Sequence, residues 1–150
     1  MNPNSINILI ADDDSDDVKL IAEGLQDILP SCNCINVRDG IATLKFLKDN
    51  VQPDLVFLDL NMPLKNGIDC LKEISGQNLL SDTPIVIYST SKNPEDIDAA
   101  YKYGAKFYIV KPASFTELKR IIKRAITILG KPLAERVDKA NFVLMETKAV

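Results

Sequence analysis

Residues 53–63, Pro-Asp-Leu-Val-Phe-Leu-Asp-Leu-Asn-Met-Pro, contain a run of four apolar residues that ends abruptly at Asp59. An unbroken apolar run of this length between two prolines is typical of a strand covered on both faces, as at the centre of a parallel sheet. Asp59 then lies at the carboxyl end of that strand, where open α/β sheets bind their ligands. Because an acid packs poorly directly after such a strand, we expect Asp59 to have a chemical role.

The same kind of apolar segment recurs along the chain, and each one is followed by a segment with helical spacing of its apolar residues. Strands are predicted at residues 6–11, 34–37, 55–58, 84–88 and 106–110. Helices are predicted at residues 15–29, 41–47, 68–76, 94–103 and 115–129. This alternation predicts an α/β fold, a doubly wound, five-stranded parallel sheet with five helices on its two faces. We interpret residues 5–129 as one domain and residues 130–150 as a tail that could hold a short helix.

Composition limits the class of protein. The chain has 150 residues, 46% of them hydrophobic and 26% charged, which is ordinary for one soluble globular domain. A net charge of −3 leaves no basic surplus to neutralise nucleic acid. The sequence shows neither an apolar run of membrane-spanning length nor a signal peptide, so we expect a cytoplasmic protein with no membrane partner. Three cysteines without any histidine favour free thiols over a disulfide framework or a zinc site.

Polar residues gather where the predicted strands end. Asp12 and Asp13 follow the first strand, Asp59 the third, Ser89 the fourth and Lys111 the fifth. The carboxyl ends of parallel strands share one edge of the sheet, where three carboxylates would repel one another and raise their pKa values. A hard divalent cation, Mg²⁺ or alternatively Mn²⁺, removes that penalty. A carboxylate nucleophile, a metal, an amine and a hydroxyl together could receive a phosphoryl group.

A simpler interpretation exists for each residue taken alone. A single aspartate after a strand most often caps a helix or forms a turn, and we interpret Asp14, Asp16 and Asp17 in that way. For the site as a whole, the simpler interpretation would have to hold independently at four strand ends. The combined arrangement therefore favours a phosphoryl-transfer site.

These residues give the chain a family resemblance over residues 5–129. The chain resembles the receiver domain of two-component response regulators, and in particular the small stand-alone receivers partnered with phytochrome-like sensor kinases. The matching features, in chain order, are Asp12-Asp13, Asp59 with Met62-Pro63 and Gly67, Ser89, and Lys111-Pro112. The resemblance implies a flavodoxin-like sheet with strand order 2-1-3-4-5.

The resemblance also implies metal-binding roles. Asp59 would be the phosphoacceptor. Asp13 and Asp59 would bind Mg²⁺ through their side chains, and Asn61 would bind it through its backbone carbonyl. Asp12 would act mostly through a metal-bound water.

Further roles follow from the resemblance at the fourth and fifth strands. Lys111 would pair with the phosphoryl oxygens, and its bond to Pro112 is expected to be cis. Ser89 would be the switch hydroxyl and Tyr108 the switch aromatic residue. The chain departs from the family pattern in having Ser89 where threonine is commoner, and Thr90 where alanine or glycine is usual.

The resemblance thus implies a single-domain response regulator that is not an enzyme beyond its own phosphorylation and dephosphorylation. Its expected partners are a sensor histidine kinase or histidine phosphotransfer protein, an unidentified downstream protein and, through the face of the fourth helix, fifth strand and fifth helix, a second copy. Three alternatives are weighed against it. A phosphatase of the haloacid dehalogenase type would need a second acid where Asn61 stands, and a flavodoxin would need a phosphate-cradling loop after the first strand. A degenerate receiver that only binds partners would not need the full set of acids, hydroxyl and lysine.

Overall fold

The structure is a computed structural model that describes residues 5–130 and 138–146. Its strands are β1 (Ile6–Ala11), β2 (Cys32–Val37), β3 (Leu55–Leu58), β4 (Ile85–Ser89), β5 (Phe107–Val110) and β6 (Val143–Leu144). They form one sheet in the order β2-β1-β3-β4-β5-β6, and every neighbouring pair is parallel. The predicted doubly wound sheet and its order over the first five strands are confirmed. The sixth strand was not predicted.

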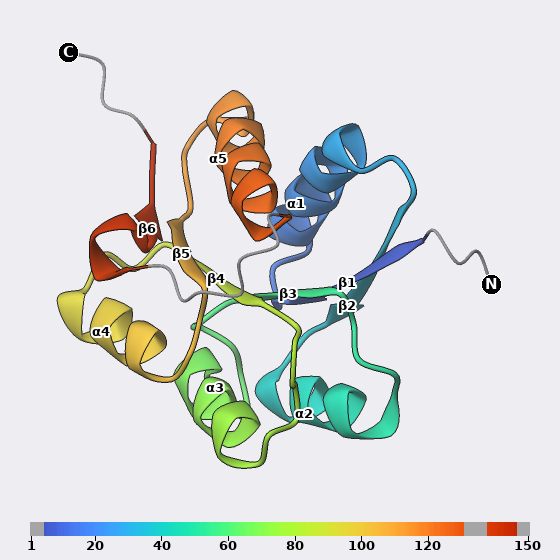
Figure 1. The fold of residues 1–150 in the computed structure, drawn as a ribbon, viewed down its shortest axis with the longest axis vertical. Helices are drawn as coiled ribbons and strands as arrows, with labels where there is room; N and C mark the ends of the chain where they lie inside the picture. Colours follow the sequence, from blue (N-terminus) through green and yellow to red (C-terminus); the bar gives the residue numbers. More distant parts are fainter. Residues whose placement is uncertain (1–4, 131–137, 147–150) are drawn as a thin grey trace.

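Helices cover both faces of the sheet (Figure 1). They are α1 (Ser15–Ile28), α2 (Gly40–Asp49), α3 (Gly67–Gly76), α4 (Pro94–Lys102) and α5 (Phe115–Leu129). Helices α1 and α5 lie on one face, and α2, α3 and α4 lie on the other (Figure 1). The hydrophobic core accordingly forms two clusters, one on each side of the sheet.

The central strand β3 explains why residues 53–63 dominate the fold. All four of its residues are buried, with Val56 and Leu58 in the cluster beneath α3 and Leu55 and Phe57 in the cluster beneath α1 and α5. Burial of one such side chain contributes about 1.5–3 kcal/mol before the entropy of ordering is subtracted. A strand buried on both faces therefore fixes where its last residue, and Asp59 after it, must lie.

Local signals set the helix ends much as predicted. Asp14 caps α1 by accepting hydrogen bonds from the backbone amides of Asp16 and Asp17. Pro94 occupies the first turn of α4, and Ser114 caps α5. Asp14 and Ser114 satisfy amides at the start of a helix that otherwise lack partners, and Pro94 has no amide hydrogen that would need one.

The segment after α5 differs from the expected tail. A short 3₁₀ helix, Lys139–Asn141, leads into β6, which pairs with β5 through the registers Tyr108↔Val143 and Ile109↔Leu144. Phe142 lies between the 3₁₀ helix and β6 in the sequence, and it is fully buried against Tyr101 and Tyr108. These residues belong to the sheet and its core, and the expected short helix is a single 3₁₀ turn. The rest of the predicted tail, residues 131–137 and 147–150, lies outside the described residues.

Two negative expectations from the sequence can be compared with the structure. Cys32, Cys34 and Cys70 are free thiols. Among residues 5–130 and 138–146, no helix has the length and apolarity that a membrane crossing requires.

Candidate functional site

Three aspartates meet at the carboxyl ends of β1 and β3. Carboxylate oxygens of Asp12, Asp13 and Asp59 lie within 4.8 Å of one another. The parallel register places Ala11 beside Leu58, so the residues that follow them are adjacent. Asp12 and Asp59 are buried, whereas Asp13 is exposed. The predicted convergence of the three carboxylates is confirmed.

Main-chain contacts hold Asp12 in place. Its amide donates to the carbonyl of Val37 on β2, and its Oδ1 accepts a hydrogen bond of 2.9 Å from the amide of Asp14. The side-chain amide of Asn36 donates to the carbonyl oxygens of Ile10 and Asp12. The acid at the end of β1 is therefore fixed by both the sheet and the start of α1.

The backbone of Asp59 packs closely against the start of α3. Gly67, the first residue of α3, lies so near that a Cβ atom there would collide with the carbonyl oxygen of Asp59. The amide of Gly67 donates to the carbonyl of Leu60, which locks this approach. The amide of Asn61 also donates to Asp59 Oδ1 at 3.3 Å. The role of the Asn61 carbonyl as a metal ligand stays a prediction.

Lys111 brings a positive charge to the carboxylates. Its Nζ lies 2.7 Å from Asp17, 3.2 Å from Asp12 and 3.5 Å from Asp59. It also lies 4.9 Å from the centre of the Tyr88 ring, an arrangement that favours a cation. The prediction that Lys111 lies at the same edge of the sheet as the acids is confirmed.

The predicted cis bond between Lys111 and Pro112 is wrong for this structure, because no peptide bond among the described residues is cis. The Lys111 amide donates to the Ser89 carbonyl at 2.8 Å, which continues the pairing of β5 with β4 past the last strand residue. The lysine side chain then reaches the carboxylates with a trans bond.

Burial and the neighbouring charges shift the pKa values of Asp59 and Lys111. Burial raises the pKa of Asp59 to about 6, with Lys111 opposing this rise and Asp12 adding to it. The pKa of Lys111 lies above its usual value. Burial lowers it, but the hydrogen bond to Asp17 and the charges of Asp59 and Asp12 outweigh burial. The raised pKa of Lys111 shows that the acids stabilise its charge, and the raised pKa of Asp59 shows that Lys111 compensates this buried acid only in part.

Ser89 is the last residue of β4, where the sequence predicts it, and Tyr108 is the second residue of the neighbouring strand β5. The Ser89 hydroxyl is fully buried and accepts a hydrogen bond of 3.1 Å from the amide of Ser91. The Tyr108 hydroxyl donates to the carbonyl of Ser91 at 2.9 Å. Both residues therefore meet the same loop residue, although their movement as a switch stays a prediction.

The donor set fits a divalent cation. Three carboxylates in reach of one another offer hard oxygen ligands, and one of them is exposed, so an ion can enter from solvent. Such an ion would stabilise the charged form of Asp59 and lower its raised pKa, which would remove the main cost of burying this carboxylate. These residues would hold Mg²⁺ or Mn²⁺, in agreement with the sequence prediction.

Two residues of the site have contacts that the sequence did not reveal. Asp17 lies in the first turn of α1 and makes the shortest contact with Lys111, so its interpretation as a helix-start residue is incomplete. Ser91 connects Ser89 and Tyr108 and also donates its hydroxyl to Asp96. The only sequence signal for either was its place a few residues after a strand end.

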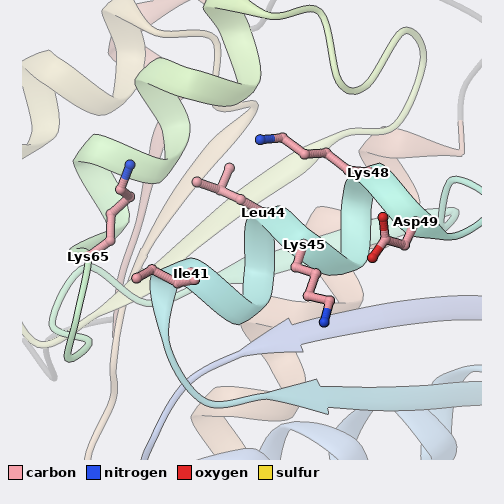
Figure 2. Close-up of a pocket in the computed structure, with 6 residues that line it drawn as sticks. All are labelled: Ile41, Leu44, Lys45, Lys48, Asp49 and Lys65. Atoms are coloured by element: carbon pink, nitrogen blue, oxygen red, sulfur yellow. The ribbon is translucent and has the colours of Figure 1, made fainter.

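A shallow pocket lies elsewhere, on the surface of α2 (Figure 2). It has a volume of about 360 Å³ and is lined by Ile41, Leu44, Lys45, Lys48, Asp49 and Lys65. Figure 2 shows that Lys65 comes from the loop before α3 and the other five from α2. None of these residues belongs to the acidic cluster, so we assign the functional site to the strand ends.

Comparison with known proteins agrees with this geometry. Response regulator Rcp1 of Synechocystis sp. is 31% identical over 128 residues, which are 81% of this chain and 86% of Rcp1. Several other curated relatives are longer, and the chain spans only 45% to 49% of their length.

Two solved structures show the same fold. The phosphorylated cyanobacterial phytochrome response regulator RcpA matches with a TM-score of 0.77 and 32% identity, over 83% of this chain and 94% of RcpA. The Mn²⁺-bound form of Rcp1 matches with a TM-score of 0.72 and 27% identity, over 86% of this chain and 97% of that chain. The family model described as "Response regulator receiver domain" matches residues 8–123, and the chain belongs to that family.

Proposed function

We propose that this chain accepts a phosphoryl group onto Asp59 from the phosphohistidine of a sensor histidine kinase or a histidine phosphotransfer protein. One observation carries the proposal. The buried Asp59 carboxylate lies within one cluster with Asp12 and Asp13, and the Lys111 amine is 3.5 Å from it. This is the charge arrangement that phosphoryl transfer needs, since the protein mainly positions the groups and neutralises charge.

In the proposed reaction, a carboxylate oxygen of Asp59 forms a bond to phosphorus while the nitrogen–phosphorus bond of the donor breaks. The leaving imidazole takes up a proton. Near neutral pH Asp59 is mostly ionised, because its pKa of about 6 lies below that pH. A bound divalent cation supplies positive charge to the transferring oxygens. Lys111 supplies a second positive charge by exchanging a carboxylate partner for a phosphoryl oxygen.

The acyl phosphate would then change the loop between β4 and α4. The Ser89 hydroxyl, which accepts a hydrogen bond from the Ser91 amide in this structure, would turn toward the phosphoryl group. Because the Tyr108 hydroxyl donates a hydrogen bond to Ser91, the Tyr108 ring and the start of α4 would move together with this loop. The likeness to the phytochrome response regulator RcpA supports a phytochrome-like kinase as the source of the phosphoryl group.

The output would be contact with another protein or relay of the phosphoryl group, in the cytoplasm. The chain would catalyse only its own phosphorylation and dephosphorylation. A homodimer through the face of α4, β5 and α5 would have to include β6 and Phe142, which occupy that face in the structure. The net charge of −3 supports a partner other than nucleic acid.

Phosphorylation can be tested with a small phosphodonor, such as acetyl phosphate, and Mg²⁺. Mass spectrometry of the intact chain should show the addition of one phosphoryl group, which is absent in Asp59→Ala and retained in the surface control Asp49→Asn. Labelling of Asp59→Ala at an unchanged rate would reject the assignment. A chain with no labelling and no beryllofluoride binding would be a binding module only, and turnover of p-nitrophenyl phosphate would indicate the phosphatase alternative.

A further inference from the structure

The Lys111 amine is shared unevenly among three carboxylates. Its distance to Asp17, 2.7 Å, is shorter than its distances to Asp12 and Asp59, 3.2 and 3.5 Å. Asp12 and Asp59 belong to the group of oxygens that could hold a metal ion, and Asp17 does not. The lysine therefore interacts most closely with an acid outside the metal cluster.

Burial places Asp17 at the rim of the site. Its side chain is 27% exposed, against 1% for Asp12 and 6% for Asp59, and the Lys111 side chain is 10% exposed. The amine thus lies between two deeply buried carboxylates and one that is partly in contact with solvent. An acid at the rim can hold the amine without removing a second charge completely from water.

We propose that Asp17 is a positioning residue that holds the Lys111 amine at the rim, and so leaves Asp12 and Asp59 available to the divalent cation. The part of this proposal that concerns the cation is independent of the proposed function. Only the later transfer of the amine to a phosphoryl oxygen rests on it.

The reason lies in competition for oxygen atoms. An ammonium group close to Asp12 and Asp59 uses the lone pairs and the negative charge that a cation needs, and it also repels the cation. If Asp17 lost its charge, the carboxylates left within 3.5 Å of the amine would be Asp12 and Asp59. The lysine would then move into the cluster and weaken metal binding.

A purely local role for Asp17 must be separated from this one. Negative charge in the first turn of a helix is favourable in any case, and Asp16 and Asp17 both lie in the first turn of α1. Asp16 is exposed, and Lys111 makes its ion pairs with Asp12, Asp17 and Asp59. Asp16→Asn therefore removes the same charge from the same helix turn and is the matched control for Asp17→Asn.

Calorimetric titration with Mn²⁺ alone tests the proposal on the unphosphorylated chain. Asp17→Asn should weaken Mn²⁺ binding about two- to fivefold, as expected for loss of one partly exposed ion pair, and Asp16→Asn less than about 1.5-fold. In a Lys111→Met background, Asp17→Asn should have no more effect than Asp16→Asn, because the coupling needs the amine. Equal effects of the two asparagine variants, or an undiminished effect of Asp17→Asn without the lysine, would overturn the proposal.

A second measurement keeps the test valid if Lys111→Met does not fold. The side-chain ¹⁵N resonance of Lys111 should shift in Asp17→Asn and stay in place in Asp16→Asn, and Mn²⁺ should broaden it more strongly in Asp17→Asn. An unchanged resonance in Asp17→Asn would also overturn the proposal. Normal metal binding without any labelling by acetyl phosphate would instead contradict the proposed function and leave this inference standing.

Discussion

The hydroxyl of Tyr108 donates a hydrogen bond of 2.9 Å to the backbone carbonyl of Ser91, which connects β5 to the loop before α4. The ring of Tyr108 is fully buried, so the carbonyl would lose its partner inside the protein if the hydroxyl were removed. Tyr108→Phe should therefore lower the free energy of unfolding by about 1–2 kcal/mol, measured by urea denaturation. Tyr103→Phe changes a half-exposed ring and should stay within about 0.5 kcal/mol of the parent. Equal stability of the two variants would contradict the role given to the Tyr108 hydroxyl.

The pKa of Asp59 predicts a pH-dependent penalty in the metal-free protein. Burial raises this pKa from 3.8 to about 6, so the folded chain binds more protons than the unfolded chain between these values. The favourable contribution of the group is complete below pH 3.8 and is lost as pH rises through about 6.

Asp59→Asn should consequently be more stable than the parent by about 1–3 kcal/mol at pH 7.5 in EDTA. This difference in the free energy of unfolding should shrink steadily as the pH falls toward 4. Urea denaturation at several pH values measures it, and a variant that is less stable than the parent at pH 7.5 would show that the buried charge is already well compensated.

Divalent metal should stabilise the folded chain through the acidic cluster. Mn²⁺ at a hundred times its dissociation constant should raise the free energy of unfolding by about 2.7 kcal/mol. Asp13 is the exposed member of the cluster, and Asp13→Asn should remove most of this gain at the same Mn²⁺ concentration. Asp69→Asn, on the exposed start of α3, should keep the gain. A full Mn²⁺ effect in Asp13→Asn would place the ion elsewhere.

Phe142 should contribute to stability as a core residue. Its ring is fully buried, with its centre 5.1 Å from that of Tyr101 and 6.3 Å from that of Tyr108. Phe142→Ala should cost about 3–5 kcal/mol of unfolding free energy, as other buried aromatic truncations do. Met145→Ala, at a side chain that is 44% exposed, should cost less than about 0.5 kcal/mol. A small effect of Phe142→Ala in thermal denaturation would show that β6 packs weakly on β5.

Two glycines of α3 should respond in opposite ways to alanine. A Cβ atom at Gly67 would collide with the backbone of Asp59, whereas a Cβ at Gly76 would meet nothing within 4 Å. Gly67→Ala should destabilise the chain by about 2 kcal/mol or more and should also weaken Mn²⁺ binding, because Asp59 must move. Gly76→Ala should be neutral or stabilising by up to about 1 kcal/mol. Normal Mn²⁺ affinity in Gly67→Ala would mean that the acidic cluster tolerates the shift.

The fold was predictable because its strands are buried on both faces. The four apolar residues of β3 and the acid that follows them indicate a central parallel strand and its ligand-binding end without any further information. Once parallel strands are expected, Asp12, Asp59 and Lys111 must share an edge, and the structure confirms that they do. Periodicity and strand polarity are thus enough for this part of the site.

Contacts that depend on side-chain reach were not predictable in this way. Asp17 had a sufficient local explanation at the start of α1, and only the position of the Lys111 amine in space reveals its second role. Strand β6 has two residues, Val143 and Leu144, which is too short for any periodic pattern. The isomer of the bond before Pro112 depends on tertiary contacts in the same way.

The position of β6 also affects how the chain should be divided in experiments. The family match ends at residue 123, but the buried surface continues through Phe142 and Leu144. A fragment cut after α5 would leave the outer edge of β5 without its hydrogen-bonding neighbour and would uncover aromatic rings beside it. Bare strand edges of this kind promote self-association, so such a fragment should aggregate more readily than the whole chain and could be mistaken for a genuine oligomer.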